Sequence, residues 1–271
     1  MKGFLRFYDS FAQVREELHV IFLIDNSGSM EGKKIAAVNN AIRDIISVMP
    51  EVQREANADI KIAALKFSDK ASWVFPSPRD IDRFRWSDLS ADGGTNLSSA
   101  YENLAMWLSK QINGGQMPNK IGLSPIIILM TDGVPTSEDW EKKLEILKKR
   151  EWFKAALRYA LAIDITTEEA MEVLRKFTGG PETVLKVRSP EALREVIKVI
   201  AVTASKVKTS SNTNTNTNNN NNNNNNSNSK SNADYNFNRG FDRQAEPEEK
   251  NNEAAQLAIK DQLRFMGDVE W

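Results

Sequence analysis

The chain has 271 residues, with 36 Lys and Arg, 37 Asp and Glu, one His and no Cys, and its formal net charge is −1. The lack of Cys excludes disulfides, thiolate zinc sites and Cys nucleophiles. The balanced charge argues against a nucleic-acid surface or a polybasic membrane patch. No apolar run approaches the ~20 residues that span a bilayer, and Arg6 and Asp9 interrupt the only early apolar residues. These features favour a soluble, cytoplasmic protein without a secretory signal.

Composition divides the chain into four parts. Residues 1–18 form a short N-terminal extension, and residues 19–207 alternate apolar runs with amphipathic stretches, which predicts one domain. Residues 208–245 include a long run of Asn and cannot bury apolar surface, so we expect a disordered linker. Residues 246–271 carry apolar residues at helical spacing and predict a short helix. That helix is either a docking motif or an unremarkable tail.

The elements predicted within the large domain alternate between strand and helix. In chain order they begin with a strand at 20–24, a helix at 35–52, a hairpin pairing 60–64 with 73–75, and a helix at 97–112. They continue with a strand at 126–130, a helix at 141–149, a strand at 159–163, a helix at 167–177, a strand at 183–187 and a helix from 190 to about 207.

This order of elements predicts the fold class. The uniformly apolar runs at 20–24 and 126–130 are typical of parallel strands that are buried on both faces. Strands alternating with helices indicate right-handed βαβ units. We therefore expect an α/β fold with a doubly wound, mostly parallel sheet, one antiparallel edge strand and helices on both faces, followed by a disordered Asn-rich tail. In such folds ligands bind outside the carboxyl ends of the strands.

Three polar loops lie where this fold would bind a ligand. The loop after the first buried strand carries Asp25, Ser27 and Ser29, whose alternate positions can share one side of an extended chain. A second loop carries Thr95 in Gly-Gly-Thr, and the loop after the central strand carries Asp132 in Thr-Asp-Gly. Each loop alone also has the composition of an ordinary turn or helix cap. Together they offer hard oxygen donors, which suit Mg²⁺ first and Mn²⁺ or Ca²⁺ next.

The order and spacing of these residues resemble the metal-ion-dependent adhesion site of von Willebrand factor A (vWA) domains, and the resemblance covers the whole predicted domain. It implies that Ser27 and Ser29 bind the metal directly and that Thr95 binds it directly or through water. It implies that Asp25 and Asp132 act largely through bound water. One coordination position would then stay open for an Asp or Glu of a protein partner.

A narrower likeness concerns residues 129–136, Trp140 and the stretch from 152 to 180. These segments resemble the short intracellular bacterial vWA domains of the tellurium-resistance and stress-response type, as in TerY-like proteins. Such proteins tend to be encoded beside a protein kinase and a metal-dependent phosphatase. The likeness therefore implies one of those enzymes as the partner.

Two classes of function remain open from the sequence, and the interaction class includes an adaptor for an ATPase of the metal-insertion kind. The first is a metal-dependent protein-interaction module without catalytic activity, and the alternative is a Mg²⁺-dependent phosphotransfer or hydrolytic enzyme with Asp25 as nucleophile. The first is favoured because no general acid or base is indicated near Asp25, and because hydroxyl ligands leave the ion electrophilic toward a partner carboxylate. The single His, His19, opens a strand and is expected to be a core or edge residue.

Overall fold

The computed structural model describes residues 15–56, 58–120, 123–180 and 183–187, most positions from 189 to 202, and the segments 257–263 and 269–270. Its strands are β1 (Glu17–Asp25), β2 (Asp59–Phe67), β3 (Ala71–Trp73), β4 (Arg79–Asp80), β5 (Ile126–Thr131), β6 (Leu157–Ile163), β7 (Val184–Val187) and β8 (Val269–Glu270). Its helices are α1 (Lys33–Ala56), α2 (Leu97–Trp107), α3 (Trp140–Leu147), α4 (Glu151–Ala155) and α5 (Glu168–Thr178). Further helical residues lie between 191 and 202 and at 257–263.

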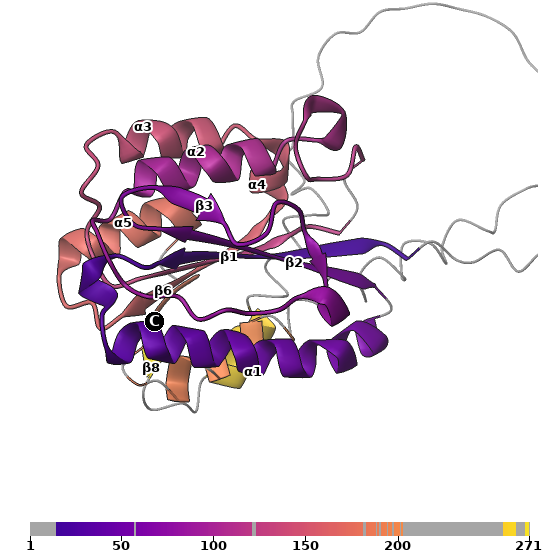
Figure 1. Ribbon diagram of the computed structural model, residues 1–271, viewed down its shortest axis with the longest axis horizontal. Coiled ribbons are helices and arrows are strands. Elements are labelled where there is room, and N and C mark those ends of the chain that lie inside the picture. The colour runs from indigo at the N-terminus through magenta and orange to yellow at the C-terminus, as the bar shows by residue number, and fades with distance from the viewer. Residues whose placement is uncertain are drawn as a thin grey trace, which may run out of the picture.

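The strands form one sheet through the middle of the molecule (Figure 1). Its order is β3-β2-β1-β5-β6-β7-β8, and β4 pairs with β2 outside this path. The five central strands, β2, β1, β5, β6 and β7, are parallel to one another. The centre is parallel because helices connect its strands and cover both faces, as the uniformly apolar β1 and β5 predict. The α/β, mostly parallel fold is therefore confirmed.

Antiparallel strands close both edges of the sheet. The predicted hairpin is present, with β3 antiparallel to β2 and Phe67 opposite Ala71. At the other edge β8 is antiparallel to β7, with Val269 opposite Val187. The sequence predicted the hairpin but neither β4 nor β8, because two-residue strands are too short to show an alternating pattern.

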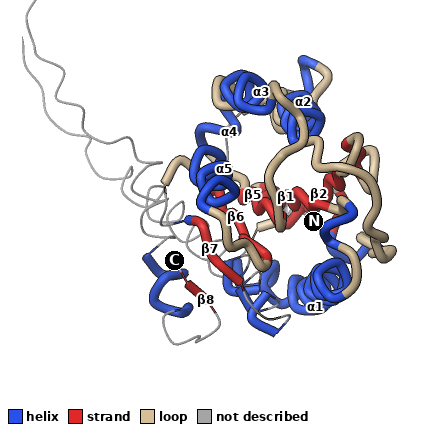
Figure 2. The backbone as a smooth tube through the Cα atoms, turned by 90° about the vertical axis from the view of Figure 1, so that its left-hand side faces the viewer, coloured by secondary structure: helices blue, strands red, loops and turns tan. Residues whose placement is uncertain are grey.

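Helices cover the sheet in two layers, which Figure 2 shows with α1 on one side and α2, α3, α4 and α5 on the other. The side chains of β1 alternate between the two cores: Phe22 packs with α1, and Leu23 packs with α2 and α5. On α1, the apolar residues that the sequence places on one face are buried together in the first core. These are Ile35, Val38, Ile42, Ile45 and Met49.

Two helices differ from their predicted extent. The helix expected at 97–112 ends at Trp107, and a separate 3₁₀ turn follows at Gln111–Asn113, closed by Gly114 at a φ of 79°. The helix α4 was not predicted. It is separated from α3 by Arg150, whose extended backbone interrupts the helical period. No helix in the described part of the chain is long and apolar enough to cross a membrane.

Residues near the C-terminus pack against the same domain. In the helical segment 257–263, Ile259 and Leu263 are buried in the core that also holds α1. The predicted linker 208–245 lies outside the described residues, as do residues 1–14 of the predicted N-terminal extension. The domain boundaries at 18, 207 and 245 therefore remain predictions, while the contacts of Ile259, Leu263 and β8 place this part of the C-terminal segment on the domain.

We expect Leu263→Ala to lower the free energy of unfolding by about 2–4 kcal/mol, the usual loss for a truncated core leucine. Leu263 is 1% exposed. Leu257, in the same segment, is 62% exposed and serves as the control, with an expected change of less than about 0.5 kcal/mol for Leu257→Ala. Urea unfolding measures both. Equal, small changes would show that this segment contributes nothing to the fold.

Candidate metal centre

The loops that follow β1 and β5 lie side by side because these two strands are parallel neighbours. The hydroxyl oxygens of Ser27 and Ser29 are 3.0 Å apart, and Ser29 Oγ donates to Asp132 Oδ1 at 2.7 Å. Together with Asp25, whose Oδ1 accepts the Ser27 N–H at 2.8 Å, they form a continuous chain of contacts. The structure thus brings together four of the five residues expected at the site.

Asp25 is the most deeply buried residue of this cluster, and it is fully inaccessible to solvent. Its Oδ2 accepts a hydrogen bond from Thr131 Oγ1 at 2.5 Å, and its Oδ1 is taken by the Ser27 N–H. Burial raises the pKa of the Asp25 carboxyl above its usual range, and these hydrogen bonds only partly offset that rise. A divalent cation beside the loop would favour the ionised carboxylate. The donor set therefore fits a cation.

Lys34 is a further member of this cluster and was not predicted from the sequence. Its Nζ lies 2.6 Å from Asp132 Oδ2, in an ion pair, while Ser29 holds the other oxygen of the same carboxylate. The Asp132 side chain is 1% exposed, so its charge is buried and compensated. The signal in the sequence was a Lys in the first turn of the helix that follows the Ser29 loop.

Thr95 joins the site through the backbone of its loop. The Gly28 N–H donates to the Gly93 carbonyl at 2.9 Å, which ties this loop to the one after β1. The Thr136 N–H donates to the Thr95 carbonyl at 2.9 Å, and Thr136 Oγ1 accepts the Thr95 N–H at 3.1 Å. Thr95 is consequently held between the loops after β1 and β5.

Asp69, in the turn after β2, fixes the glycines before Thr95. Its Oδ1 accepts the Gly94 N–H at 2.7 Å, and its carbonyl accepts from the Asn96 side chain at 3.0 Å. Gly93 has a φ of +76°, and a Cβ built there would lie 2.8 Å from Asp69 Cγ. Asp69 lies between the two predicted strands of the hairpin and was not predicted to belong to the site. Its position after a parallel strand was the available signal.

Asn39 on α1 anchors the segment that leads into the Thr95 loop. Its Oδ1 accepts the Leu89 N–H at 2.9 Å and Trp86 Nε1 at 3.2 Å, and its Nδ2 donates to the Leu89 carbonyl at 2.9 Å. Asn39 is 4% exposed, so these bonds satisfy an otherwise costly buried amide. The helix that starts beside the Ser29 loop therefore also positions the approach to Thr95.

A metal ion at this centre would depend on hydroxyl donors. Among the described residues, no group of three or more His, Cys, Asp or Glu is arranged to hold a metal. His19 is buried on β1 with its Nε2 3.5 Å from Glu17 Oε2, and it lies six residues, about 20 Å, before Asp25. This agrees with its expected role as a core residue. Any ion at the Asp25 cluster would be held by hydroxyl and carboxylate oxygens, a set that suits hard cations.

Comparisons with known proteins agree with the fold. The family model for the von Willebrand factor type A domain matches residues 19–199. The bovine inter-alpha-trypsin inhibitor heavy chain H4 is 30% identical over 125 residues, which cover 44% of this chain and 13% of the bovine protein. The chain therefore spans about an eighth of that relative's length, and the similarity concerns one region of it.

Solved structures show the same fold at low sequence identity. The open conformation of the pilus adhesin SpaC from Lactobacillus rhamnosus GG has a TM-score of 0.56 and 14% identity, covering 72% of this chain and 30% of that chain. Proximal thread matrix protein 1 from the mussel byssus, with a zinc-occupied MIDAS motif, has a TM-score of 0.50 and 17% identity, covering 70% of this chain and 46% of that chain. At such identities the likeness establishes the fold alone.

We expect Gly93→Ala to destabilise the protein more than Gly114→Ala. Both glycines have positive φ, so both substitutions strain the backbone by about 1 kcal/mol or more. Only at Gly93 would the new methyl group collide with another residue, because nothing lies within 4 Å of a Cβ at Gly114. Relief of that collision would move Asp69 away from the Gly94 N–H. Urea unfolding compares the two variants, and equal losses would show that Asp69 does not constrain the loop.

Proposed function

The chain belongs to the von Willebrand factor type A domain family, and we propose that it is a metal-dependent protein-interaction module. In this proposal one divalent ion lies at the carboxyl edge of the sheet, and an acidic residue of a protein partner completes its coordination. The residues proposed to hold the ion, directly or through water, are Asp25, Ser27, Ser29, Thr95 and Asp132.

One observation carries the proposal: hydroxyl and carboxylate oxygens from two separate loops converge on one point. Ser29 Oγ lies 3.0 Å from Ser27 Oγ and 2.7 Å from Asp132 Oδ1, although Asp132 is 103 residues away in the sequence. Hydroxyls that bond one another in this arrangement have lone pairs to offer a cation. Mg²⁺ is the proposed ion, with Mn²⁺ or Ca²⁺ as substitutes, because every donor is a hard oxygen. The zinc in the mussel byssus protein makes Zn²⁺ a competitor to include in titrations.

The charge of the centre favours a carboxylate partner. Of the five residues proposed to hold the ion, Asp25 and Asp132 are the acidic ones, and Lys34 already compensates part of the charge on Asp132. A divalent ion bound there would retain net positive charge, because its remaining donors are neutral hydroxyls and water. Such an ion attracts an additional anionic oxygen, which an Asp or Glu side chain supplies.

The alternative enzymatic role is less well supported by the geometry. A nucleophilic Asp25 would need an accessible oxygen, yet its side chain is fully buried and both oxygens accept hydrogen bonds. Lys34, the cationic side chain at the cluster, is paired with Asp132 rather than placed beside Asp25. This arrangement fits a residue that shapes a metal loop better than one that attacks a substrate.

A more specific proposal concerns the biological setting. The likeness of residues 129–136, Trp140 and 152–180 to TerY-like domains suggests a cytoplasmic adaptor in a bacterial stress-response or tellurium-resistance system. Its partner would then be a protein kinase or a metal-dependent phosphatase. This part of the proposal depends on sequence likeness.

We expect the protein to bind one divalent ion and the double variant Ser27→Ala/Ser29→Ala to lose that binding while it remains folded. Calorimetric titration with Mg²⁺ and Mn²⁺ measures the affinity, and circular dichroism checks the fold. Ser47→Ala, which removes an exposed hydroxyl on α1, is the control and should bind as the parent does. Unchanged ion binding in the folded double variant would reject the assignment.

We also expect capture of an acidic partner to require the ion. In pull-downs from the native host lysate, proteins retained by the immobilised chain in Mg²⁺ should be released by EDTA and absent with Ser27→Ala/Ser29→Ala. Mass spectrometry then shows whether a kinase or phosphatase is among them. If the purified chain instead turned over phosphoester substrates, with activity lost in Asp25→Ala, the enzymatic alternative would replace the proposal.

A further inference from the structure

A cavity lies at the opposite end of the sheet from the loops of the candidate metal centre. It has a volume of about 560 Å³ and is formed by two short segments, residues 108–113 after α2 and residues 149–152 before and within α4. Thr95 lies just before α2, and this cavity lies just after it. The 11 residues of that helix separate the two sites by about 16 Å. Figure 1 shows α4 far from the start of α1, where the Ser29 loop lies.

The cavity is positively charged although the whole chain is nearly neutral. Lys110, Lys149 and Arg150 line it, against a single carboxylate, Glu151. The Lys110 Nζ pairs with Glu151 Oε2 at 2.8 Å, which leaves the charges of Lys149 and Arg150 without an ion pair among the described residues. The local excess of positive charge indicates an anionic ligand.

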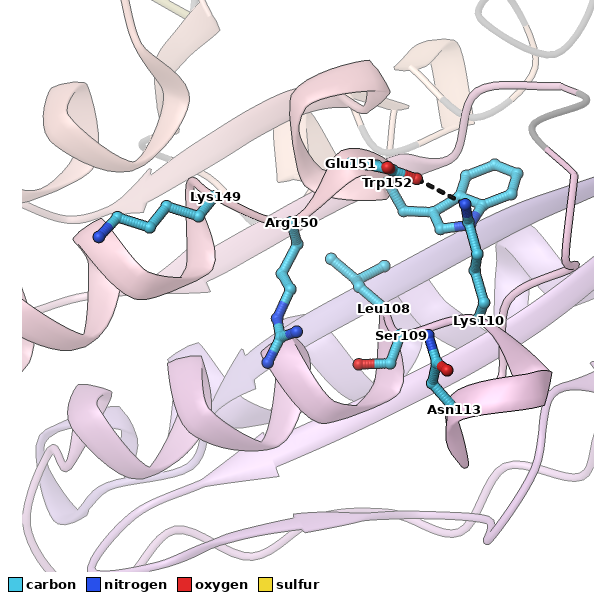
Figure 3. Close-up of a pocket in the computed structure, with 8 residues that line it drawn as sticks. All are labelled: Leu108, Ser109, Lys110, Asn113, Lys149, Arg150, Glu151 and Trp152. Atoms are coloured by element: carbon cyan, nitrogen blue, oxygen red, sulfur yellow. Dashed lines mark ion pairs between the residues drawn. The ribbon is translucent and has the colours of Figure 1, made fainter.

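Figure 3 shows how these side chains are arranged. Lys110 and Arg150 extend on two sides of the chain after α2, and the Arg150 guanidinium points toward that chain. Lys149 extends away from the other side chains and lies at the rim. The Lys110 ammonium points to Glu151, and the Arg150 guanidinium lies on the other side of Leu108, so Arg150 is the cation placed to meet a ligand in the cavity. Asn113 adds an amide to the lining.

Trp152 provides an independent sign of a missing partner. It lines the cavity and is 2% exposed, yet its Nε1 has no hydrogen-bond acceptor among the described residues. A buried N–H without an acceptor is unfavourable, so native proteins usually satisfy it with a protein group, a water or a ligand. The Nε1 atom itself has no access to solvent, so a ligand oxygen in the cavity would accept from it once the indole shifts toward the opening.

We propose that this cavity binds a phosphate monoester, with Arg150 as the main contact to its oxygens and the unpartnered Trp152 indole N–H turning to donate to it. The planar guanidinium of Arg matches the spacing of two phosphate oxygens, and a phosphate offers enough acceptors for several donors. The volume is in the range of small-molecule sites. The remaining space would accommodate the organic group of a small phosphorylated metabolite. The site is independent of the metal centre.

The test titrates the full chain with O-phosphoserine, with inorganic phosphate and with sulfate, following the indole N–H resonances by NMR. One resonance, absent from Trp152→Phe, should shift to saturation, and O-phosphoserine should bind more tightly than inorganic phosphate. Arg150→Ala should weaken binding about tenfold or more. Arg150→Lys should weaken it less, because Lys keeps the positive charge but cannot make two parallel hydrogen bonds to phosphate oxygens. Lys142→Ala, which removes an exposed charge on α3, should change the affinity by less than about twofold.

Four results would overturn the proposal. They are the absence of a saturable shift with either compound, equal losses in Arg150→Ala and Lys142→Ala, binding of sulfate as tight as that of O-phosphoserine, and binding of inorganic phosphate alone. Arg150 is exposed, so its variants are expected to fold even if Trp152→Phe does not. Repeating the titration with EDTA and with Ser27→Ala/Ser29→Ala should leave the affinity unchanged, which separates this site from the proposed metal-dependent function.

Discussion

The parallel pairing of β1 with β5 is the constraint on which the candidate metal centre depends. With Ile24 opposite Met130, the two strands end at the same level, and the polar residues that follow each strand meet there. The Thr131 hydroxyl then reaches Asp25, and Ser29 reaches Asp132. A one-residue slip would move every β1 side chain to the opposite core, so burial of the strand on both faces fixes the positions of the polar cluster.

Much of the fold could be predicted because the central strands are long and uniformly apolar, and α1 has a clear helical stripe. The same patterns placed the polar loops at one edge of the sheet and so indicated four residues that the structure brings together, with Thr95 held nearby by its backbone. Short elements escaped prediction. The strands β4 and β8 have two residues each and α4 has five. These lengths are too short to show the two-residue repeat of a strand or the 3.6-residue repeat of a helix.

The residues that support the candidate metal centre could not be predicted for a different reason. Lys34, Asn39 and Asp69 act through contacts whose partners lie 98, 50 and 25 residues away in the sequence. Each has an ordinary local explanation as a helix or turn residue, and only the tertiary arrangement distinguishes it. The basic cavity was not predicted either. Its two segments lie far apart in the sequence and share no motif that would indicate a common site.

The position of β8 changes what the Asn-rich stretch connects. Because Leu263 is buried beside α1 and β8 pairs with β7, the stretch between residues 202 and 257 has described elements of one domain at both ends. It therefore joins two parts of that domain. Where both ends of a segment are fixed, doubling the number of residues between them adds only about 0.6 kcal/mol of closure entropy. Gain or loss of a few Asn residues would thus leave the stability of the domain almost unchanged.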